Sequence, residues 1–193
     1  AVIRSGVLRQ MKKYLMKDNR DGSEAVYETS VGISETDTEI TFAFDAKHSG
    51  FYCPYHEYNE IHSCGDAVEV LIGTDPGRGK YYEIEVSPEN GKMLALMRYL
   101  GTDGEGKVKL DIGFIDESKC FFRSSVTRTS DGYVAVITIN KDEAGLNGDG
   151  VYFNAYRLET DGGEQEKHLF ALNPTMCGKF HVPSKYVYLK DFV

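Results

Sequence analysis

Hydrophobic and polar residues alternate with a period of two along much of this chain, which is the pattern of half-buried β-strands. In the segment 39–45, Ile40, Phe42 and Phe44 alternate with smaller or more polar residues. Other runs of strand length are rich in β-branched and aromatic residues, which favour strands. The pattern predicts strands at residues 26–33, 39–45, 67–72, 81–86, 92–100, 107–115, 121–129, 133–139, 151–158 and 185–192.

This succession of strands predicts an all-β fold. About ten strands follow one another at short spacing, without a long helical pattern and without the βαβ rhythm of a parallel sheet. We therefore expect an antiparallel β-sandwich of the immunoglobulin or jelly-roll kind. The 193 residues can bury one sizeable core, so we expect a single domain over residues 1–193, with residues 1–24 as an N-terminal extension or edge segment.

The clearest hairpin joins the strands 67–72 and 81–86 through the glycine-rich turn 74–79. Because side chains alternate across a strand, its apolar residues share one face and its acids the other. The polar face carries Glu69, Tyr81, Glu83 and Glu85. Such a face is either solvated surface or the floor of a binding groove, and periodicity does not decide between them.

Charge and composition exclude some classes of partner. Acidic residues outnumber basic ones, 30 to 22, and the net charge of −8 disfavours a nucleic-acid partner, which needs clustered Lys and Arg. No apolar run reaches the roughly 20 residues of a membrane-spanning helix, and residues 1–14 lack the apolar core of a signal peptide. Four cysteines are too few for a disulfide scaffold and leave the redox compartment open.

The segment 47–65 is a long loop rich in His, Tyr and Cys, and loops of this length in compact domains usually have a function. Within it Cys53, His56, His62 and Cys64 are residue types that bind zinc, but their spacing matches no standard zinc finger. A Cys53–Cys64 disulfide and an ordinary aromatic loop are the alternatives.

Several motifs together resemble family 9 carbohydrate-binding modules. They are, in order, GDAVEVLIGTDPGRGKYYEIEVSPENG, LALMR, SVTRTSDGYVAVITI, VYFNAYRLE, LFALNPT and FHVPSKYVYL, and they extend from about residue 39 to the C-terminus. The resemblance implies a non-catalytic β-sandwich related to the DOMON group. It also implies binding of a mono- or oligosaccharide, frequent attachment to glycoside hydrolases, and an extracellular or exported location.

The resemblance also indicates site residues. Glu69, Arg98, Asn154 and Arg157 occupy the family's polar positions, and the expected groove has Glu69, Arg98 and Asn154 on its floor. A carboxylate, a guanidinium and an amide can together fix the orientation of sugar hydroxyls. Strand alternation places Arg157 opposite Asn154, so only a bulge would bring both into the groove. Truncation of Arg98 to Ala is then expected to weaken sugar binding by about 1–3 kcal/mol.

The chain departs from the family in having no tryptophan. The two tryptophans that sandwich a sugar ring in the family fall near Ser63 and Leu172 here. Since flat aromatic rings bury the apolar face of a sugar, other aromatic residues must replace them if this mode of binding is kept. The candidates are Tyr55, Tyr58, Tyr156 and Phe170.

Three other kinds of chemistry stay open. Acidic loops at Asp75, 142–149 and 159–166 are either solvated turns or oxygen ligands for a structural calcium ion, although none has EF-hand spacing. A glycoside hydrolase would use a carboxyl pair from Glu57, Glu69, Glu83 and Glu85. A DOMON-like haem site would draw its axial ligands from Met93, Met97, His168 and His181.

Overall fold

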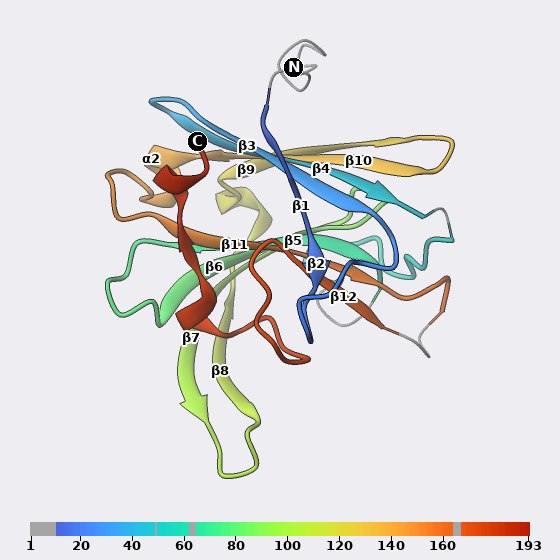
Figure 1. Ribbon diagram of the computed structural model, residues 1–193. Helices are drawn as coiled ribbons and strands as arrows, with labels where there is room; N and C mark the ends of the chain where they lie inside the picture. Colours follow the sequence, from blue (N-terminus) through green and yellow to red (C-terminus); the bar gives the residue numbers. More distant parts are fainter. Residues whose placement is uncertain (1–10, 49, 62–64, 164–166) are drawn as a thin grey trace.

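The computed structural model describes residues 11–48, 50–61, 65–163 and 167–193 and consists of two antiparallel β-sheets packed face to face (Figure 1). The predicted antiparallel β-sandwich is thus confirmed. The described residues form thirteen strands rather than about ten. The three additional strands are β1 (Lys13–Leu15), β2 (Lys17–Asp18) and β12 (His168–Ala171), which are too short to show a period. The strand predicted at 185–192 is shorter than expected, because only β13 (Val187–Tyr188) forms there.

The first sheet, sheet A, has five strands, and every neighbouring pair is antiparallel. Its order is β1 (Lys13–Leu15), β3 (Thr29–Glu35), β4 (Glu39–Lys47), β10 (Gly132–Asn140) and β9 (Phe122–Arg128).

The second sheet, sheet B, is wider and carries the candidate site. Its order is β2 (Lys17–Asp18), β12 (His168–Ala171), β11 (Tyr152–Glu159), β5 (Ala67–Gly73), β6 (Lys80–Val86), β7 (Lys92–Thr102) and β8 (Val108–Phe114), with β13 (Val187–Tyr188) also pairing with β11. The segment before residue 25 thus supplies an edge strand to each sheet. In Figure 1 the β7–β8 hairpin projects away from the sandwich.

The main hydrophobic core fills the space between the two sheets. Along β4, buried and partly exposed residues alternate strictly, as the sequence predicts for a half-buried strand. Phe42 of β4 packs on Phe153 of β11 with ring centroids 5.3 Å apart. Val68, Val70 and Ile72 of β5 point into the same core, so Glu69 and Leu71 lie on the outer face of sheet B.

The outer face of sheet B is covered rather than solvated. A second hydrophobic cluster lies on it, formed by sheet residues such as Leu71, Met93 and Met97 together with Ile61 and Tyr186 from outside the main strands. Ile61 belongs to the aromatic loop, and Tyr186 to the segment 172–186, which crosses this face after β12. The aromatic loop at residues 47–65 therefore lines part of this outer face.

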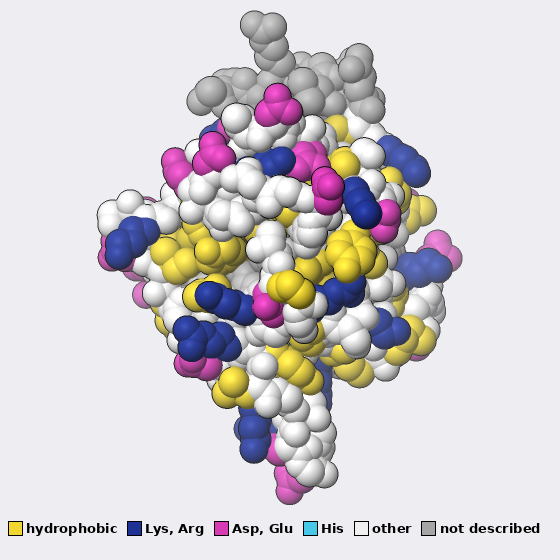
Figure 2. All heavy atoms as spheres, turned by 90° about the vertical axis from the view of Figure 1, so that its left-hand side faces the viewer, with side chains coloured by type: hydrophobic (Ala, Val, Ile, Leu, Met, Phe, Trp, Pro, Cys, Tyr) yellow, Lys and Arg dark blue, Asp and Glu magenta, His cyan; other side chains and the backbone are white. Residues whose placement is uncertain are grey.

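Helical structure in the described residues is limited to short pieces. The α-helix α2 spans Lys141–Ala144, and single 3₁₀ turns cover Glu117–Lys119, Pro183–Lys185 and Leu189–Asp191. In the described parts of the chain, no helix has the length and apolarity that a membrane crossing requires. On the face in Figure 2, basic and acidic side chains are intermixed around hydrophobic patches, so this face offers no continuous basic surface to a nucleic acid.

Candidate functional site

Three glutamates converge on the outer face of sheet B, and we call them the glutamate triad. Glu69 comes from β5, and Glu83 and Glu85 come from β6, where strand alternation points them to the same side. The register places Glu69 directly opposite Glu85. One carboxylate oxygen from each residue lies within 4.8 Å of the others, and the three residues are only 5%, 6% and 7% exposed.

The triad has no described Lys or Arg within ion-pair distance. Its nearest basic group is His181, whose Nε2 lies 3.4 Å from Glu83 Oε1. Burial raises the pKa of Glu83 to about 7. Burial, followed by repulsion from the neighbouring carboxylates, raises the pKa of Glu69 and Glu85 well above the ordinary value.

The imidazole of His181 does not supply the missing positive charge at neutral pH, because burial lowers its pKa to about 4. Its Nδ1 lies 3.0 Å from the hydroxyl of Tyr81, which holds the ring in place. The triad therefore combines buried carboxyls with a neutral imidazole. Protons or a cation would neutralise the carboxylates, and hydroxyl groups would donate hydrogen bonds to them.

The strand register defines what surrounds the triad. One row across the sheet runs from Tyr156 through Glu69 and Glu85 to Met93. The next row runs Asn154, Leu71, Glu83, Ala95 and Phe114. Phe114, on the edge strand β8, is 46% exposed and so offers an apolar ring on the same face as the acids. Sequence reasoning missed Phe114, which alternation would have revealed once the register of β7 and β8 was known.

Asn154 and Tyr156 share this face but are fully buried beneath the segment 172–186. Asn154 Nδ2 donates to the Tyr156 hydroxyl and to the carbonyl of Asn173, both at 2.8 Å, while Asn154 Oδ1 accepts from the Asn173 amide at 3.1 Å. The Tyr156 hydroxyl donates to the carbonyl of Phe180 at 2.9 Å, and the two rings stack 4.2 Å apart. These residues hold the covering segment on the sheet.

Arg98, Arg157 and Phe170 lie on the other side of sheet B, so the expected groove with Arg98 on its floor is not formed. Met97 faces the triad, and the next residue in the strand must face away. The Arg98 side chain is 60% exposed there, 3.9 Å from Asp111. Arg157 points to the face of sheet B opposite to that of Asn154, as strand alternation predicts. Its register partner Phe170 is buried with it in the core between the sheets.

The remaining aromatic candidates divide between the two faces. Tyr58 packs against the core between the sheets, as does Leu172, whereas Tyr55 packs against the outer-face cluster. Ser63, at the other expected tryptophan position, lies outside the described residues. Tyr55 is thus the predicted substitute aromatic that shares the triad's face and is not fully buried.

The proposed zinc ligands of the loop are only partly within the described residues, because His62 and Cys64 lie outside them. Cys53 is a free thiol, and burial together with nearby Asp66 raises its pKa to about 12. A thiol with a pKa this high is a poor thiolate ligand at neutral pH. His56 is exposed beside Glu89, 3.4 Å away.

The other metal and cofactor candidates are also dispersed. Asp75 Oδ2 accepts from the amide of Gly79, and Asp142 Oδ1 from the side chain of Asn147, so each carboxylate braces its own loop. The oxygen-only triad is the described group that best suits calcium. Of the residues considered for haem, Met93 and Met97 are buried in the outer-face cluster, and His168 is at the start of β12.

Comparison with known proteins shows the fold. No protein-family model matches the chain, and no curated protein matches it either. A candidate carbohydrate-binding protein from Bacteroides uniformis superposes with a TM-score of 0.72 at 14% identity, covering 94% of this chain and 87% of its own. A family 9 carbohydrate-binding module from Caldicellulosiruptor kristjanssonii in complex with glucose gives 0.61 at 13% identity, covering 97% and 87%.

A further structure of a family 9 module from that organism, in complex with cellotriose, gives a TM-score of 0.52 at 12% identity, covering 86% of this chain and 74% of its own. The chain has the fold of the family 9 carbohydrate-binding modules. In this version of the family 9 fold, the outer face of sheet B carries the glutamate triad and a covering segment, and tryptophan is absent from the sequence.

Proposed function

We propose that the chain is a non-catalytic carbohydrate-binding module whose ligand site is the outer face of sheet B around the glutamate triad. The observation that carries the proposal is the triad itself: three buried carboxyls that retain a little exposure and have no basic partner apart from His181 among the described residues. The likeness to modules solved with glucose and cellotriose supports a sugar as the ligand.

The chemistry of the triad suits sugar hydroxyls. A hydroxyl both donates and accepts hydrogen bonds, and a carboxylate is a strong acceptor for it. With the pKa of Glu83 raised to about 7 and those of Glu69 and Glu85 raised well above their ordinary value, part of the triad is protonated at neutral pH and also donates. The triad can therefore satisfy neighbouring hydroxyls of one ring in both directions.

An apolar surface next to the acids would hold the carbon face of the ring. Phe114 and Ile112 of the edge strand β8 are each 46% exposed, and the register puts both on the triad's side of the sheet. A ring stacked on Phe114 would replace part of the burial that tryptophan provides in the family. We infer a mono- or oligosaccharide as the ligand, an exported protein, and an association with glycoside hydrolases.

Saturation-transfer difference NMR with a panel of mono-, di- and trisaccharides tests the proposal, because it detects weak as well as tight binding. We expect saturation transfer to at least one sugar, strongest to the protons on its ring carbons. We also expect the sugar to be recovered intact. Loss of saturation in Phe114→Ala, but not in the control Leu100→Ala on the same hairpin, would support stacking on β8. Absence of saturation transfer to every sugar and to soluble polysaccharide would contradict sugar binding. Cleavage of a sugar during the measurement would show that the protein hydrolyses sugars, contrary to the proposal of a non-catalytic module.

A further inference from the structure

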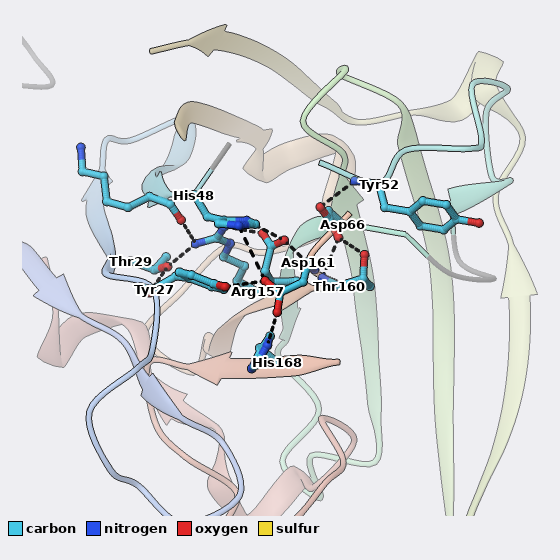
Figure 3. A network of polar contacts seen from close by, with 11 residues as sticks. Tyr27, Thr29, His48, Tyr52, Asp66, Arg157, Thr160, Asp161 and His168 are labelled. Atoms are coloured by element: carbon cyan, nitrogen blue, oxygen red, sulfur yellow. Dashed lines mark hydrogen bonds and ion pairs between the residues drawn. The ribbon is translucent and has the colours of Figure 1, made fainter. Parts of the chain in front are cut away.

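The polar network near the start of β12 is closed on itself (Figure 3). One oxygen of Asp161 accepts from the Tyr27 hydroxyl at 2.5 Å, and the other lies 2.8 Å from His168 Nε2. Glu159 Oε1 lies 3.1 Å from His48 Nδ1. These groups are partners for one another, so the network braces the fold. Polar groups without a partner in the described structure lie elsewhere, along the edge strand β8.

The strand β8 forms one edge of sheet B. It pairs with β7 on one side, and no strand of the described residues pairs with its other side. The β7–β8 hairpin projects from the sandwich (Figure 1) and carries exposed apolar side chains. Ile112 and Phe114 are each 46% exposed, and Leu100 is 64% exposed. An open edge with apolar side chains is a template for pairing with another chain.

The hydrogen bonds between β7 and β8 show which backbone groups of β8 point outward. The amide of Ile115, just beyond β8, donates to the carbonyl of Leu94, so these two residues form a hydrogen-bonded pair. Hydrogen-bonded and non-hydrogen-bonded pairs alternate along an antiparallel ladder. The backbone N–H and C=O groups of Val108, Leu110 and Ile112 therefore point away from β7.

Two charged residues between these outward groups determine which register suits a second β8 strand. Lys109 and Asp111 are both exposed. When two copies of β8 pair antiparallel about Leu110, Lys109 of each copy lies opposite Asp111 of the other. Leu110 then pairs with itself, and Val108 pairs with Ile112 of the second copy, through their outward backbone groups. A centre at residue 109 or 111 would instead set like charges opposite each other, which is unfavourable.

The edge strand of sheet A lacks this self-complementarity. β9 is also seven residues long, but its charged side chains are both basic, Arg123 and Arg128. They already pair with Glu39 and Glu89. In the described structure β9 carries none of the exposed large apolar side chains. Of the two seven-residue edges, β8 is thus the one suited to pairing with itself.

We propose that β8 pairs with the β8 strand of a second copy of this chain, antiparallel and centred on Leu110, to form a homodimer with a continuous sheet. The outward backbone groups supply the hydrogen bonds, and opposite charges fix the register. The contact is isologous, because each copy uses the same strand, so it closes at two copies.

The dimer would place two candidate sites on one surface. Residues directly opposite each other in paired strands point to the same face, so the outer faces of the two B sheets become continuous. The β6 strands of the two copies would lie five strand spacings apart, or about 24 Å. If the proposed function holds, a glycan long enough to reach both glutamate triads would bind with higher avidity than a monosaccharide.

Sedimentation velocity of the full chain without sugar, over a wide range of concentrations, tests the proposal. We expect a monomer–dimer equilibrium. Lys109→Asp and Asp111→Lys each set like charges opposite each other in the dimer and should weaken it about 10-fold or more. An equimolar mixture of the two variants should dimerise again, because every opposing pair then has opposite charges. The control Lys119→Asp, on an exposed lysine outside β8, should dimerise as the wild type does.

The mixture also excludes misfolding as the cause of lost dimerisation. Asp111→Lys removes a contact of 3.9 Å with Arg98, but both side chains are exposed and the contact contributes little to stability. Amide hydrogen exchange gives a second measure: exchange at Leu110 and Ile112 should slow as the dimer forms, because their outward N–H groups become hydrogen-bonded.

Three outcomes would overturn the proposal. They are a chain that stays monomeric up to about 1 mM, a dimer that both charge variants leave unchanged, and an association in which the amides of Leu110 and Ile112 exchange as fast as in the monomer. Because sugar is absent from these measurements, their failure would leave sugar binding at the triad untouched, and failure of sugar binding would leave the dimer untouched.

Discussion

Glu69 and Glu85 stand directly opposite each other on neighbouring strands, on a sheet face that is almost closed to solvent. Like charges in such cross-strand positions destabilise a sheet, and burial adds to the cost. Glu83 lies beside them with its pKa raised to about 7. The protein therefore carries a group of residues that oppose its own stability, which is typical of a binding site.

The first prediction concerns the pH dependence of stability. The pKa of Glu83 is higher in the folded state than its ordinary 4.5, so its contribution is fully favourable below about 4.5 and is lost as pH rises through 7. Glu83→Gln should therefore gain stability over the wild type between pH 5 and pH 8, by up to about 3 kcal/mol. Urea unfolding of both proteins across this range measures the difference.

The unfolding free energy of the wild type must be compared with that of Glu83→Gln, because the titration of His181 changes stability with pH in the opposite direction. Its pKa is lowered from 6.5 to about 4, so its contribution is lost as pH falls below 6.5. Subtracting the two unfolding curves cancels most of this effect. A stability difference between Glu83→Gln and the wild type that stays constant from pH 5 to pH 8 would contradict the raised pKa.

The second prediction concerns Arg157, which the resemblance to family 9 modules suggests as a sugar ligand and which the structure buries. Arg157 Nη1 donates to Thr29 Oγ1 and to the carbonyl of Lys47, both at 2.8 Å, and Nη2 pairs with Glu159. Arg157→Ala leaves the Glu159 carboxylate uncompensated and should cost about 3–5 kcal/mol of unfolding free energy. Its matched control is Arg123→Ala, an exposed partner of Glu39, which should cost about 1 kcal/mol or less.

The third prediction concerns Asn154 as a brace for the covering segment. Asn154→Ala leaves the amide of Asn173 without the oxygen it bonds, and should lower the unfolding free energy by about 2–3 kcal/mol. Asn147→Ala removes a single exposed hydrogen bond and should change it by about 0.5 kcal/mol or less. Equal stability of the two variants in thermal unfolding would show that Asn154 does not hold the segment.

The sequence predicts the fold well because strand alternation is a local property. The alternating burial of β4, the apolar face of β5 and the opposite orientation of Asn154 and Arg157 all follow from a period of two. The short strands β1, β2 and β12 could not be predicted, since two to four residues contain no period and pair only because the rest of the sheet is present.

The site was predicted only in part, because most of it depends on contacts between distant residues. Alternation places Glu69 on the outer face of sheet B, as the structure has it, whereas the resemblance indicates Arg98 although its neighbour Met97 occupies that face. Nothing in the sequence shows that the segment 172–186 closes the outer face. Nor could periodicity bring His48 and His168, 120 residues apart, to one carboxylate of Asp161.

The most direct test of sugar binding at the triad is isothermal titration calorimetry with glucose and cellotriose on three proteins: the wild type, Glu69→Gln and Arg98→Ala. Both variants replace one ionisable side chain on sheet B, but only Glu69 faces the proposed site. We predict saturable binding to the wild type, an affinity reduced about 10-fold or more in Glu69→Gln, and an unchanged affinity in Arg98→Ala. Equal affinities in all three proteins, a loss confined to Arg98→Ala, or no heat with the wild type would contradict this account.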